Sequence, residues 1–484
     1  MAGAVVFRGA LSYFFAQDDF AGLARAAGIL PRLDGLWRYV SGQLYFDVMR
    51  SVAGLDAFAY HLASLLAHLV CSVLLYTLMA RRLSRAAAFT GAIFFAVHPA
   101  FFTALYSVSG IGEILSLLFA LGALWAILLP GRWNWTAAPL FALSLLSKES
   151  TLLLPLATAL GFAVPAGERP RRRLLLPLGI IAAAYAVDYL RSDVFSVGAG
   201  LSKEAAYALG EPGDIGRNLL TYLGWTSNLF LPTVRGFGDA VDPMVFPWGI
   251  ALAGLWLIGL LSRRLRERGW MAAGAVYLLF LLPVLPLRNH TYHYYLYAPM
   301  IGAAWLAAAA FDALAMPALA RKGWTVGGAA LLAGGLTLNG ALLVHKNETM
   351  PFVVADLRSD PTVDRAVIAR NVYEGLERGA LPEGATLWLW SPALAAARSD
   401  RVRLAAERVW TNNVQTALLD GVGVRVLFPQ VKEVRFVEAL PPMPPTDPVA
   451  VYRRDGRLRV SSRAELDSVL RLHPPEAADG VTGP

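Results

Sequence analysis

The sequence predicts a polytopic α-helical membrane protein that ends in a small α/β domain. The chain has 484 residues, of which 56% are hydrophobic and 16% charged, and its mean hydropathy is +0.49. A soluble domain usually carries about 25% charged residues. Apolar stretches near the roughly 20-residue length of a membrane-spanning helix recur up to about residue 344. These observations exclude a free cytosolic enzyme, a secreted module and a disordered scaffold.

The net charge of +8 supports the same class. Beyond residue 344 the chain carries 18 basic and 18 acidic residues, so the whole excess lies in the apolar part. It is concentrated in short arginine-rich loops, which is typical of cytoplasmic loops and not of a nucleic-acid-binding surface. We therefore expect no nucleic-acid partner. The single cysteine, Cys71, lies in an apolar run and excludes a disulfide framework.

The basic loops at 81–85, 132, 169–173, 263–268 and 321–322 predict the cytoplasmic side. About eleven spans follow, with a cytoplasmic N-terminus and an outer C-terminus. They are expected near 2–16, 58–79, 86–104, 112–130, 136–147, 150–166, 174–190, 247–262, 271–287, 298–316 and 325–344. The use of 38 arginines against five lysines is typical of a high-GC bacterial genome. The expected location is therefore a bacterial inner membrane.

Two segments within the membrane domain, residues 1–344, are predicted to lie outside the spans. Residues 17–57 read as a first periplasmic loop with helices along the membrane interface. Residues 191–246 read as a periplasmic or re-entrant segment that includes a helix at 217–232. Counting that helix as a span would reverse the sidedness of the later basic loops.

Residues 345–484 predict a soluble periplasmic α/β domain. The run 386–390 reads as a strand, and 449–453 with 457–460 around Asp455-Gly456 as a hairpin. Helices are expected near 363–378 and 401–420. The tail after about residue 474 is predicted to be disordered.

Ionisable residues gather at the outer ends of the predicted spans, where we expect a functional cavity. They are Asp18, Asp19, His98, Glu113, Lys148, Glu149, Arg288, His290 and His293, with the phenols of Tyr292, Tyr294, Tyr295 and Tyr297. Cations and phenols can bind a lipid phosphate and stabilise it as a leaving group. A carboxylate can remove the proton of an attacking hydroxyl. The pattern therefore favours group transfer from a lipid-phosphate donor to an outer-face acceptor.

Each group also has a structural interpretation. Asp18-Asp19 also fits a solvated helix end, His98-Pro99 also fits an interfacial cap, and Lys148-Glu149 also fits a local ion pair. The tyrosines of 292–297 also fit an aromatic belt at the membrane surface. His61 and His68, seven residues apart on one helix face, are expected to be packing or hydrogen-bonding residues.

Taken in order, these residues resemble the GT-C superfamily of integral-membrane glycosyltransferases, which take sugars from polyprenyl-phosphate donors. The sequence is most similar to the protein O-mannosyltransferase type and to the transmembrane O-mannosyltransferases with tetratricopeptide repeats, although such repeats are absent here. The matching blocks are FFAQDDF at 14–20, the loop and span at 36–83, the block at 94–124 and LSLLSKESTLLLP at 143–155, with HYYLYAPMIG at 293–302 as a weaker fifth.

The resemblance implies a GT-C fold and an inverting displacement at the anomeric carbon of the donor sugar. Asp18 or Asp19 would be the catalytic base, and Glu113 a second acid or a residue near a metal. Lys148, Arg288, His293 and Tyr297 would bind the donor phosphate, with His98, Glu149 and Tyr294 as further cavity candidates. No cofactor is certain, and a divalent metal ion is left open because some relatives use one. The acceptor would be a protein Ser/Thr hydroxyl or a glycan or glycolipid hydroxyl.

Three positions depart from the family pattern: Thr103 stands in place of an acid, Ile111 in place of an arginine, and Tyr294 in place of an arginine. These departures keep a second interpretation open, a catalytically inactive GT-C scaffold or assembly subunit. A lipid or solute transporter is a further alternative. It would favour polar groups near the membrane midplane and broken helices in matched halves, neither of which is evident.

Overall fold

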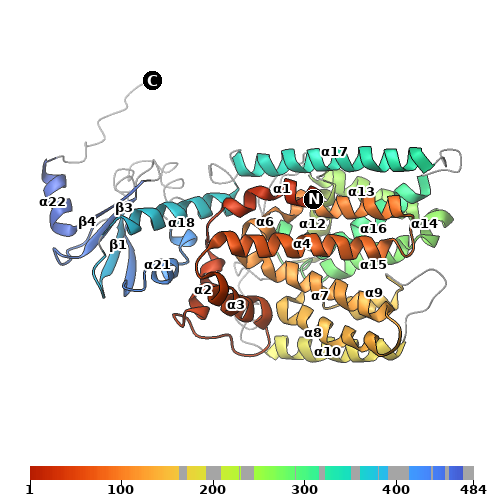
Figure 1. The fold of residues 1–484 in the computed structure, drawn as a ribbon, viewed down its shortest axis with the longest axis horizontal. Coiled ribbons are helices and arrows are strands. Elements are labelled where there is room, and N and C mark those ends of the chain that lie inside the picture. Colours follow the sequence, from red (N-terminus) through yellow and green to blue (C-terminus); the bar gives the residue numbers. More distant parts are fainter. Residues whose placement is uncertain are drawn as a thin grey trace, which may run out of the picture. The chain divides into compact units, whose positions relative to one another are not determined.

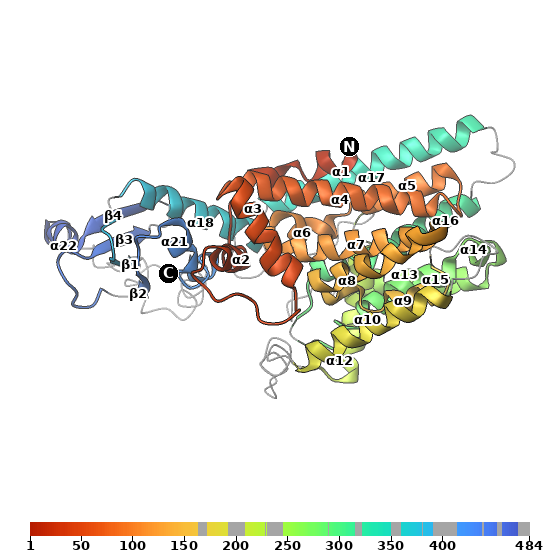
Figure 2. The ribbon, with the colours of Figure 1, turned by 60° about the horizontal axis from the view of Figure 1, so that its bottom comes forward.

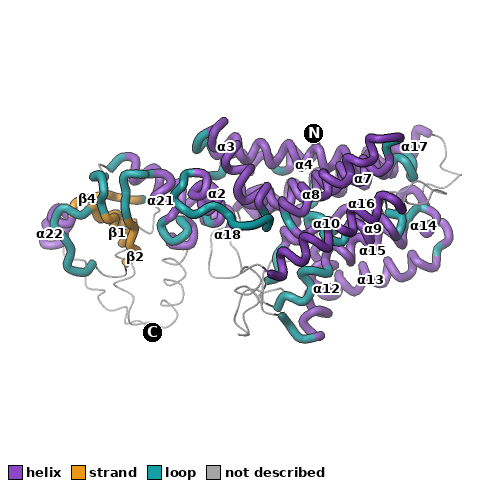
Figure 3. The backbone as a smooth tube through the Cα atoms, turned by 90° about the horizontal axis from the view of Figure 1, so that it is seen from below, coloured by secondary structure: helices purple, strands orange, loops and turns teal. Residues whose placement is uncertain are grey.

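The computed structural model describes residues 1–162, 172–191, 209–227, 229, 245–288, 290–314, 322–349, 360–379, 381–390, 414–437, 440–452 and 457–472. These residues are mostly helical, with one small sheet in the C-terminal part (Figures 1 and 3). The chain divides into two compact units. The first comprises Met1–Ser12, Leu33–Tyr45 and Ala59–Thr349, and the second comprises Tyr13–Arg32, Phe46–Phe58 and Met350–Pro484.

The first unit is a helical bundle, seen from two sides in Figures 1 and 2. Its longer helices are α4 (Ala57–Met79), α5 (Arg85–Ala96), α7 (Ile111–Leu128), α8 (Ala137–Ser147), α10 (Arg172–Arg191), α12 (Pro212–Thr226), α13 (Val245–Leu261), α15 (Trp270–Leu281), α16 (Met300–Leu314) and α17 (Lys322–Thr349). Its shorter α-helices are α1 (Ala2–Val6), α6 (Phe102–Tyr106), α9 (Leu154–Ala159) and α14 (Arg263–Glu267). The remaining turns are η1 (Arg8–Ser12), η2 (Val40–Leu44), η3 (Pro99–Phe101), η4 (Val108–Gly110), η5 (Gly131–Thr136), η6 (Glu149–Thr151) and η7 (His293–Leu296).

Three helices in the described parts are long and apolar enough to cross a membrane, within Ala57–Met79, Val108–Leu128 and Val326–Thr349. A fourth candidate is the pair Arg85–Ala96 and Pro99–Tyr106, which is bent by 41°. The apolar helices α13, α15 and α16 are shorter. By their length and composition these helices indicate a membrane protein. The number eleven remains a prediction.

The predicted first span, residues 2–16, is wrong as a single crossing helix. The structure has two five-residue turns there, α1 and η1. The second turn packs against a hydrogen bond in which the Tyr106 hydroxyl donates to Glu348 Oε1 at 2.5 Å. A side chain at Gly9 would collide with both of these groups. The segment is therefore held by tertiary packing and does not form a continuous helix.

Glycines let the helices of the first unit approach closely. A Cβ atom at Gly91 would lie 2.6 Å from the carbonyl oxygen of Ala304, so α5 packs directly on α16. One at Gly302 would lie 2.4 Å from the carbonyl oxygen of Ala273, which brings α16 onto α15. Small residues at such crossings are typical of membrane helix packing. Elsewhere α7 packs along α8, and α10 along α8 and α9.

The second unit contains a four-stranded sheet of order β2-β1-β3-β4. Its strands are β1 (Thr386–Trp390), β2 (Glu433–Val437), β3 (Pro448–Tyr452) and β4 (Leu458–Ser462), and its helices are α2 (Asp18–Ala26), α3 (Tyr45–Ala53), α18 (Pro361–Glu377), α21 (Val422–Leu427) and α22 (Arg463–Leu472). Strand β1 is parallel to both β2 and β3, and β3 is antiparallel to β4. Trp388, Trp390, Val449, Val451 and Leu466 form an apolar cluster on it.

Several predictions for this unit are confirmed. The strand at 386–390, the antiparallel pairing of the two hairpin strands and the helix near 363–378 are all present. The parallel strand β2 was not predicted. Most of the predicted helix 401–420 and the tail after 474 lie outside the described residues. The predicted boundary at 344/345 lies close to Met350, but the second unit also takes in Tyr13–Arg32 and Phe46–Phe58.

Candidate functional site

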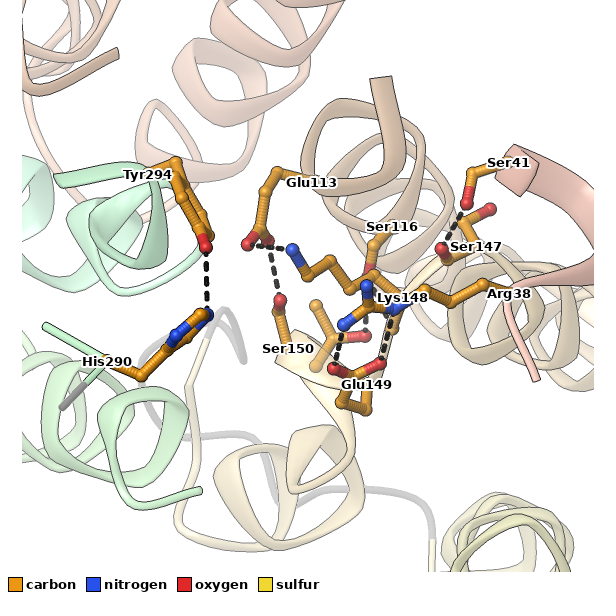
Figure 4. Close-up of polar contacts among 11 residues, drawn as sticks. Arg38, Ser41, Glu113, Ser116, Ser147, Lys148, Glu149, Ser150, His290 and Tyr294 are labelled. Carbon is orange, nitrogen blue, oxygen red and sulfur yellow. Dashed lines mark hydrogen bonds and ion pairs between the residues drawn. The ribbon is translucent and has the colours of Figure 1, made fainter. Parts of the chain in front are cut away.

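The first unit brings Glu113, Lys148, Glu149 and Tyr294 together in one cluster (Figure 4). Lys148 Nζ lies 2.9 Å from Glu113 Oε1, and the side chains are only 10% and 1% exposed. The same ammonium lies 4.9 Å from the ring centre of Tyr294 and 5.3 Å from that of Tyr295, within cation–π range. This buried ion pair, which lies beside two neighbouring tyrosine rings, is the centre of the candidate site.

The backbone around Lys148 is fixed by neighbouring hydroxyl groups. Lys148 ends α8 in an extended conformation, and its N–H donates to the carbonyl of Ser144 at 3.0 Å. Its carbonyl accepts from Ser116 Oγ at 2.9 Å. Ser41 Oγ donates to the carbonyl of Ser147 at 2.6 Å. The backbone of Lys148 is thus held at both its N–H and its carbonyl group, which fixes the point from which its side chain extends toward Glu113.

Glu113 lies in the first turn of α7, where the helix dipole favours a carboxylate. Its second oxygen accepts from Ser150 Oγ at 2.5 Å. A side chain at Gly112 would lie 3.2 Å from Ser41 Oγ and 3.4 Å from the Ser147 carbonyl oxygen. The absence of that side chain lets the start of α7, the end of α8 and the 38–41 segment converge.

Glu149 does not pair with its neighbour Lys148, so the local ion pair considered from the sequence is not what the structure shows. Instead its two oxygens accept from Arg38 Nε at 3.2 Å and from an Arg38 terminal nitrogen at 2.5 Å. Both side chains are partly buried. Burial acts to raise the pKa of Glu149, but the Arg38 charge and hydrogen bonds outweigh it and lower that pKa to about 2. Glu149 is therefore ionised at neutral pH.

Sequence reasoning did not select Arg38, although it lies in one of the family-like blocks. Arg38 has a φ of 50°, a left-handed conformation that is uncommon for a residue with a side chain. The π-helix η2 follows two residues later. Strained backbone and single π turns occur often at functional sites. Neither signal can be read from the sequence, because both are backbone conformations that no residue pattern at 38–44 indicates.

His290 adjoins the cluster, since its Nε2 is hydrogen-bonded to the Tyr294 hydroxyl at 3.3 Å (Figure 4). Burial lowers the pKa of His290 to about 4, and the nearby charges of Lys148 and Arg38 contribute to the decrease. His290 is therefore neutral at pH 7. The cluster then has two cations, Lys148 and Arg38, balanced by two carboxylates, Glu113 and Glu149.

Four predicted site residues have other surroundings. His98 is fully buried, caps η3 by accepting from the N–H of Ala100, and has its Nε2 3.1 Å from the carbonyl oxygen of Thr226. The Tyr297 hydroxyl lies 2.8 Å from His68 Nδ1. The ring of His293 stacks on Trp225 at 3.8 Å. The carbonyl of Arg288 accepts from Arg217 at 3.3 Å.

These surroundings favour a packing role for His98 and Tyr297. The hydroxyl of Tyr297 is occupied by His68, whose Nε2 lies 3.1 Å from the carbonyl oxygen of Ala96. His61 likewise has its Nδ1 3.2 Å from the carbonyl oxygen of Leu105. The expectation that His61 and His68 are packing or hydrogen-bonding residues is confirmed.

Asp18 and Asp19 belong to the second unit and open α2. Asp18 is exposed, whereas Asp19 is 1% exposed and its Oδ2 accepts from the N–H of Ala16 at 3.0 Å. Gln17, directly before them, has a φ of 52°. The solvated helix end considered from the sequence therefore fits Asp18 and not Asp19.

The described residues contain no group of three or more His, Cys, Asp or Glu side chains arranged to hold a metal ion. Glu113, the acid expected nearest a metal, is already paired with Lys148 and Ser150.

Comparison with known proteins gives one family match. A family model described as dolichyl-phosphate-mannose-protein mannosyltransferase matches residues 44–188. The match covers Glu113, Lys148 and Glu149, and it indicates a glycosyltransferase of the GT-C type. Neither the curated proteins nor the solved structures contain a match to the chain.

Proposed function

We propose that the protein is a GT-C-type glycosyltransferase that moves a monosaccharide from a polyprenyl-phosphate donor to an acceptor hydroxyl. The donor phosphate binds at Lys148. The reaction takes place at the periplasmic face of a bacterial inner membrane. The acceptor is a protein Ser/Thr hydroxyl or a hydroxyl of a glycan or glycolipid. The observation that carries the proposal is the buried Lys148 ammonium, which is paired with Glu113, lies beside two tyrosine rings and belongs to the segment that matches the mannosyltransferase family.

The chemistry of the ammonium supports a phosphate contact. A lysine ammonium has three N–H donors. Glu113 is the one acceptor within ion-pair distance of Lys148 among the described residues, and the adjacent tyrosine rings take no strong hydrogen bond from it. A phosphate oxygen can therefore join Lys148 while Glu113 keeps the ammonium oriented. In a site of low exposure such a charge-assisted contact is stronger than in water.

The proposed reaction is a single inverting displacement. The acceptor oxygen attacks the anomeric carbon, the bond from that carbon to the phosphate oxygen breaks, and the polyprenyl phosphate leaves with the electron pair. Lys148 stabilises the charge that develops on the leaving phosphate. A carboxylate takes the proton from the acceptor hydroxyl.

The exposure of the two aspartates favours Asp18 as that base. Asp18 is accessible to an acceptor, whereas Asp19 is buried and holds the Ala16 amide. We therefore assign Asp19 to the shape of the turn that presents Asp18.

The test is donor consumption by the purified full-length protein in lipid nanodiscs, with radiolabelled polyprenyl-phosphate mannose and a panel of other polyprenyl-phosphate monosaccharides, and a membrane extract as the acceptor pool. We expect Asp18→Asn to lower the rate by about 10²–10⁴-fold, the usual contribution of a general base. Lys148→Met should lower it by roughly 10²–10³-fold. The matched control is Arg268→Met, which breaks another ion pair of the first unit, with Asp312 at 2.6 Å.

The control should retain activity within about twofold, because Arg268 and Asp312 contact each other, Arg264 and Ser84, which are not part of the cluster. No consumption of any donor by the wild type would reject the proposal. Equal rates for the wild type and Lys148→Met would reject the phosphate contact.

One observation favours a second candidate, an inactive GT-C scaffold. Each cation of the cluster already has a carboxylate partner, so the cluster is complete as a structural tie between α7, α8 and the 33–45 segment. This candidate predicts that no donor is consumed, while Lys148→Met still destabilises the fold.

A further inference from the structure

The acidic turn and the C-terminal domain form one compact unit, although several hundred residues separate them in the sequence. Residues 13–32 group with 350–484 by their contacts, and α2 packs on α21. This arrangement gives the C-terminal domain a direct structural link to Asp18 and Asp19.

The first contact fixes the backbone of the turn. The N–H of Gln17 donates to the carbonyl of Ala417 at 2.9 Å. Gln17 has the left-handed φ of 52° from which α2 starts, and such a conformation persists only where the surroundings hold it. The Ala417 carbonyl therefore holds the strained residue that directly precedes Asp18.

The second contact fixes the side of α2 that follows the acids. The ring of Phe20 is fully buried and lies on Gly423, where an added Cβ atom would be 2.7–2.9 Å from three ring atoms. On its other side α2 lies close to α3, because a Cβ atom at Gly22 would be 2.4 Å from the Phe46 ring. The helix is thus enclosed between the C-terminal domain and α3.

The third contact precedes the acids. The ring of Phe14 stacks on that of Tyr373 in α18, with centres 5.3 Å apart and an angle of 26°. Contacts with the C-terminal domain therefore lie before the acidic pair, at its start and after it.

We propose that the C-terminal domain positions the acidic turn, with Gly423 and Ala417 setting the placement of Asp18 through Phe20 and Gln17. Gly423 and Phe20 are positioning residues and do not touch the substrate. The kinetic part of this inference rests on the proposed function, whereas the structural part does not.

Two glycines of the domain provide a matched pair of variants. Gly423→Ala adds a methyl group against the Phe20 ring. Gly379→Ala adds one against Val460, at 2.8–3.2 Å, in the same domain but against β4. Both variants crowd the domain to a similar degree, and only the first acts on α2.

The primary readout is hydrogen exchange of the full-length protein in nanodiscs. Gly423→Ala should speed exchange at the amides of Gln17, Asp19 and Phe20, whose hydrogen bonds form the turn, by about tenfold or more. Gly379→Ala should leave these amides unchanged. Unchanged exchange in Gly423→Ala, or equal acceleration in both variants, would overturn the proposal.

The kinetic readout is the rate of sugar transfer. Gly423→Ala should lower kcat on the order of 10²-fold, since small displacements of a catalytic group have effects of that size, with the KM for the donor unchanged. Adding Phe20→Leu should restore much of the rate, because the crowded ring is removed. A normal kcat despite accelerated exchange would overturn the positioning role. An inactive wild type would refute the proposed function, while the exchange experiment would still decide whether the domain holds the turn.

Discussion

The buried Lys148–Glu113 pair makes a quantitative prediction about stability. Lys148→Met removes the charge but retains most of the length and apolar volume of the side chain. Among the described residues, Glu113, which is 1% exposed, would then be left with the Ser150 hydroxyl as its side-chain partner. Breaking a buried pair on one side typically costs about 3–5 kcal/mol, because an uncompensated charge remains buried. We expect a loss of unfolding free energy in that range.

The comparison with related variants isolates the cause. In Lys148→Met/Glu113→Gln both charges are absent, so most of the loss should be recovered. Arg38→Met breaks the Arg38–Glu149 pair, whose side chains are 24% and 22% exposed, and should cost about 1.5–3 kcal/mol, the range for hydrogen bonds to charged groups.

The assay is reversible unfolding of the purified protein in mixed micelles, followed by circular dichroism. A cost below about 1 kcal/mol for Lys148→Met, as for a surface pair, would refute the reasoning. The reasoning would also be refuted if Lys148→Met/Glu113→Gln had the same free energy of unfolding as Lys148→Met.

Three further predictions concern pH, a hydroxyl and the cysteine. The pKa of His290 is lowered from its usual 6.5 to about 4, so the folded state favours the neutral ring. The free energy of unfolding should therefore be highest above pH 6.5 and decrease as the pH falls toward 4. His290→Gln should remove this part of the pH dependence. Because the pKa of Glu149 is lowered, the free energy of unfolding should decrease further as the pH falls from about 4.5 to about 2. Glu149→Gln should abolish this second decrease. Ser150→Ala should cost about 1.5–3 kcal/mol in the same unfolding assay, because it removes a hydrogen bond to a buried carboxylate, and an unchanged midpoint would contradict that role. Cys71 is fully buried, so a maleimide should label it only as the protein unfolds, and rapid labelling of the native protein would contradict the packing around it.

The sequence was informative where the signal is local. Hydropathy located α4, α7 and α17, because a long apolar helix is visible in a single window. The short apolar run at 386–390 located β1, and the two runs around the turn sequence Asp455-Gly456 located the β3–β4 pair. The parallel strand β2 was missed because its pairing with β1 depends on residues far apart in the chain, for which a single segment gives no sign.

In the candidate site, too, the sequence indicated the unusual residues but not their long-range contacts. Lys148 and Glu149 were selected as an unusual charged pair, but their partners could not be inferred from the sequence. In the extended conformation of Lys148, successive side chains point to opposite sides, so the lysine meets Glu113 and the glutamate meets Arg38. His98 and Tyr297 were equally unusual in the sequence, yet their polar atoms contact other residues of the fold.

The most direct test of the central claim is the affinity of the protein for polyprenyl phosphate, measured by equilibrium binding of a fluorescent polyprenyl phosphate in nanodiscs. Lys148→Met/Glu113→Gln, which removes the ammonium without leaving a buried charge, should raise the Kd about tenfold or more, equivalent to about 1.4 kcal/mol. The control Arg268→Met/Asp312→Asn, which removes another ion pair of the first unit, should leave it unchanged. Equal Kd values for the wild type and both double variants would contradict a donor phosphate at Lys148.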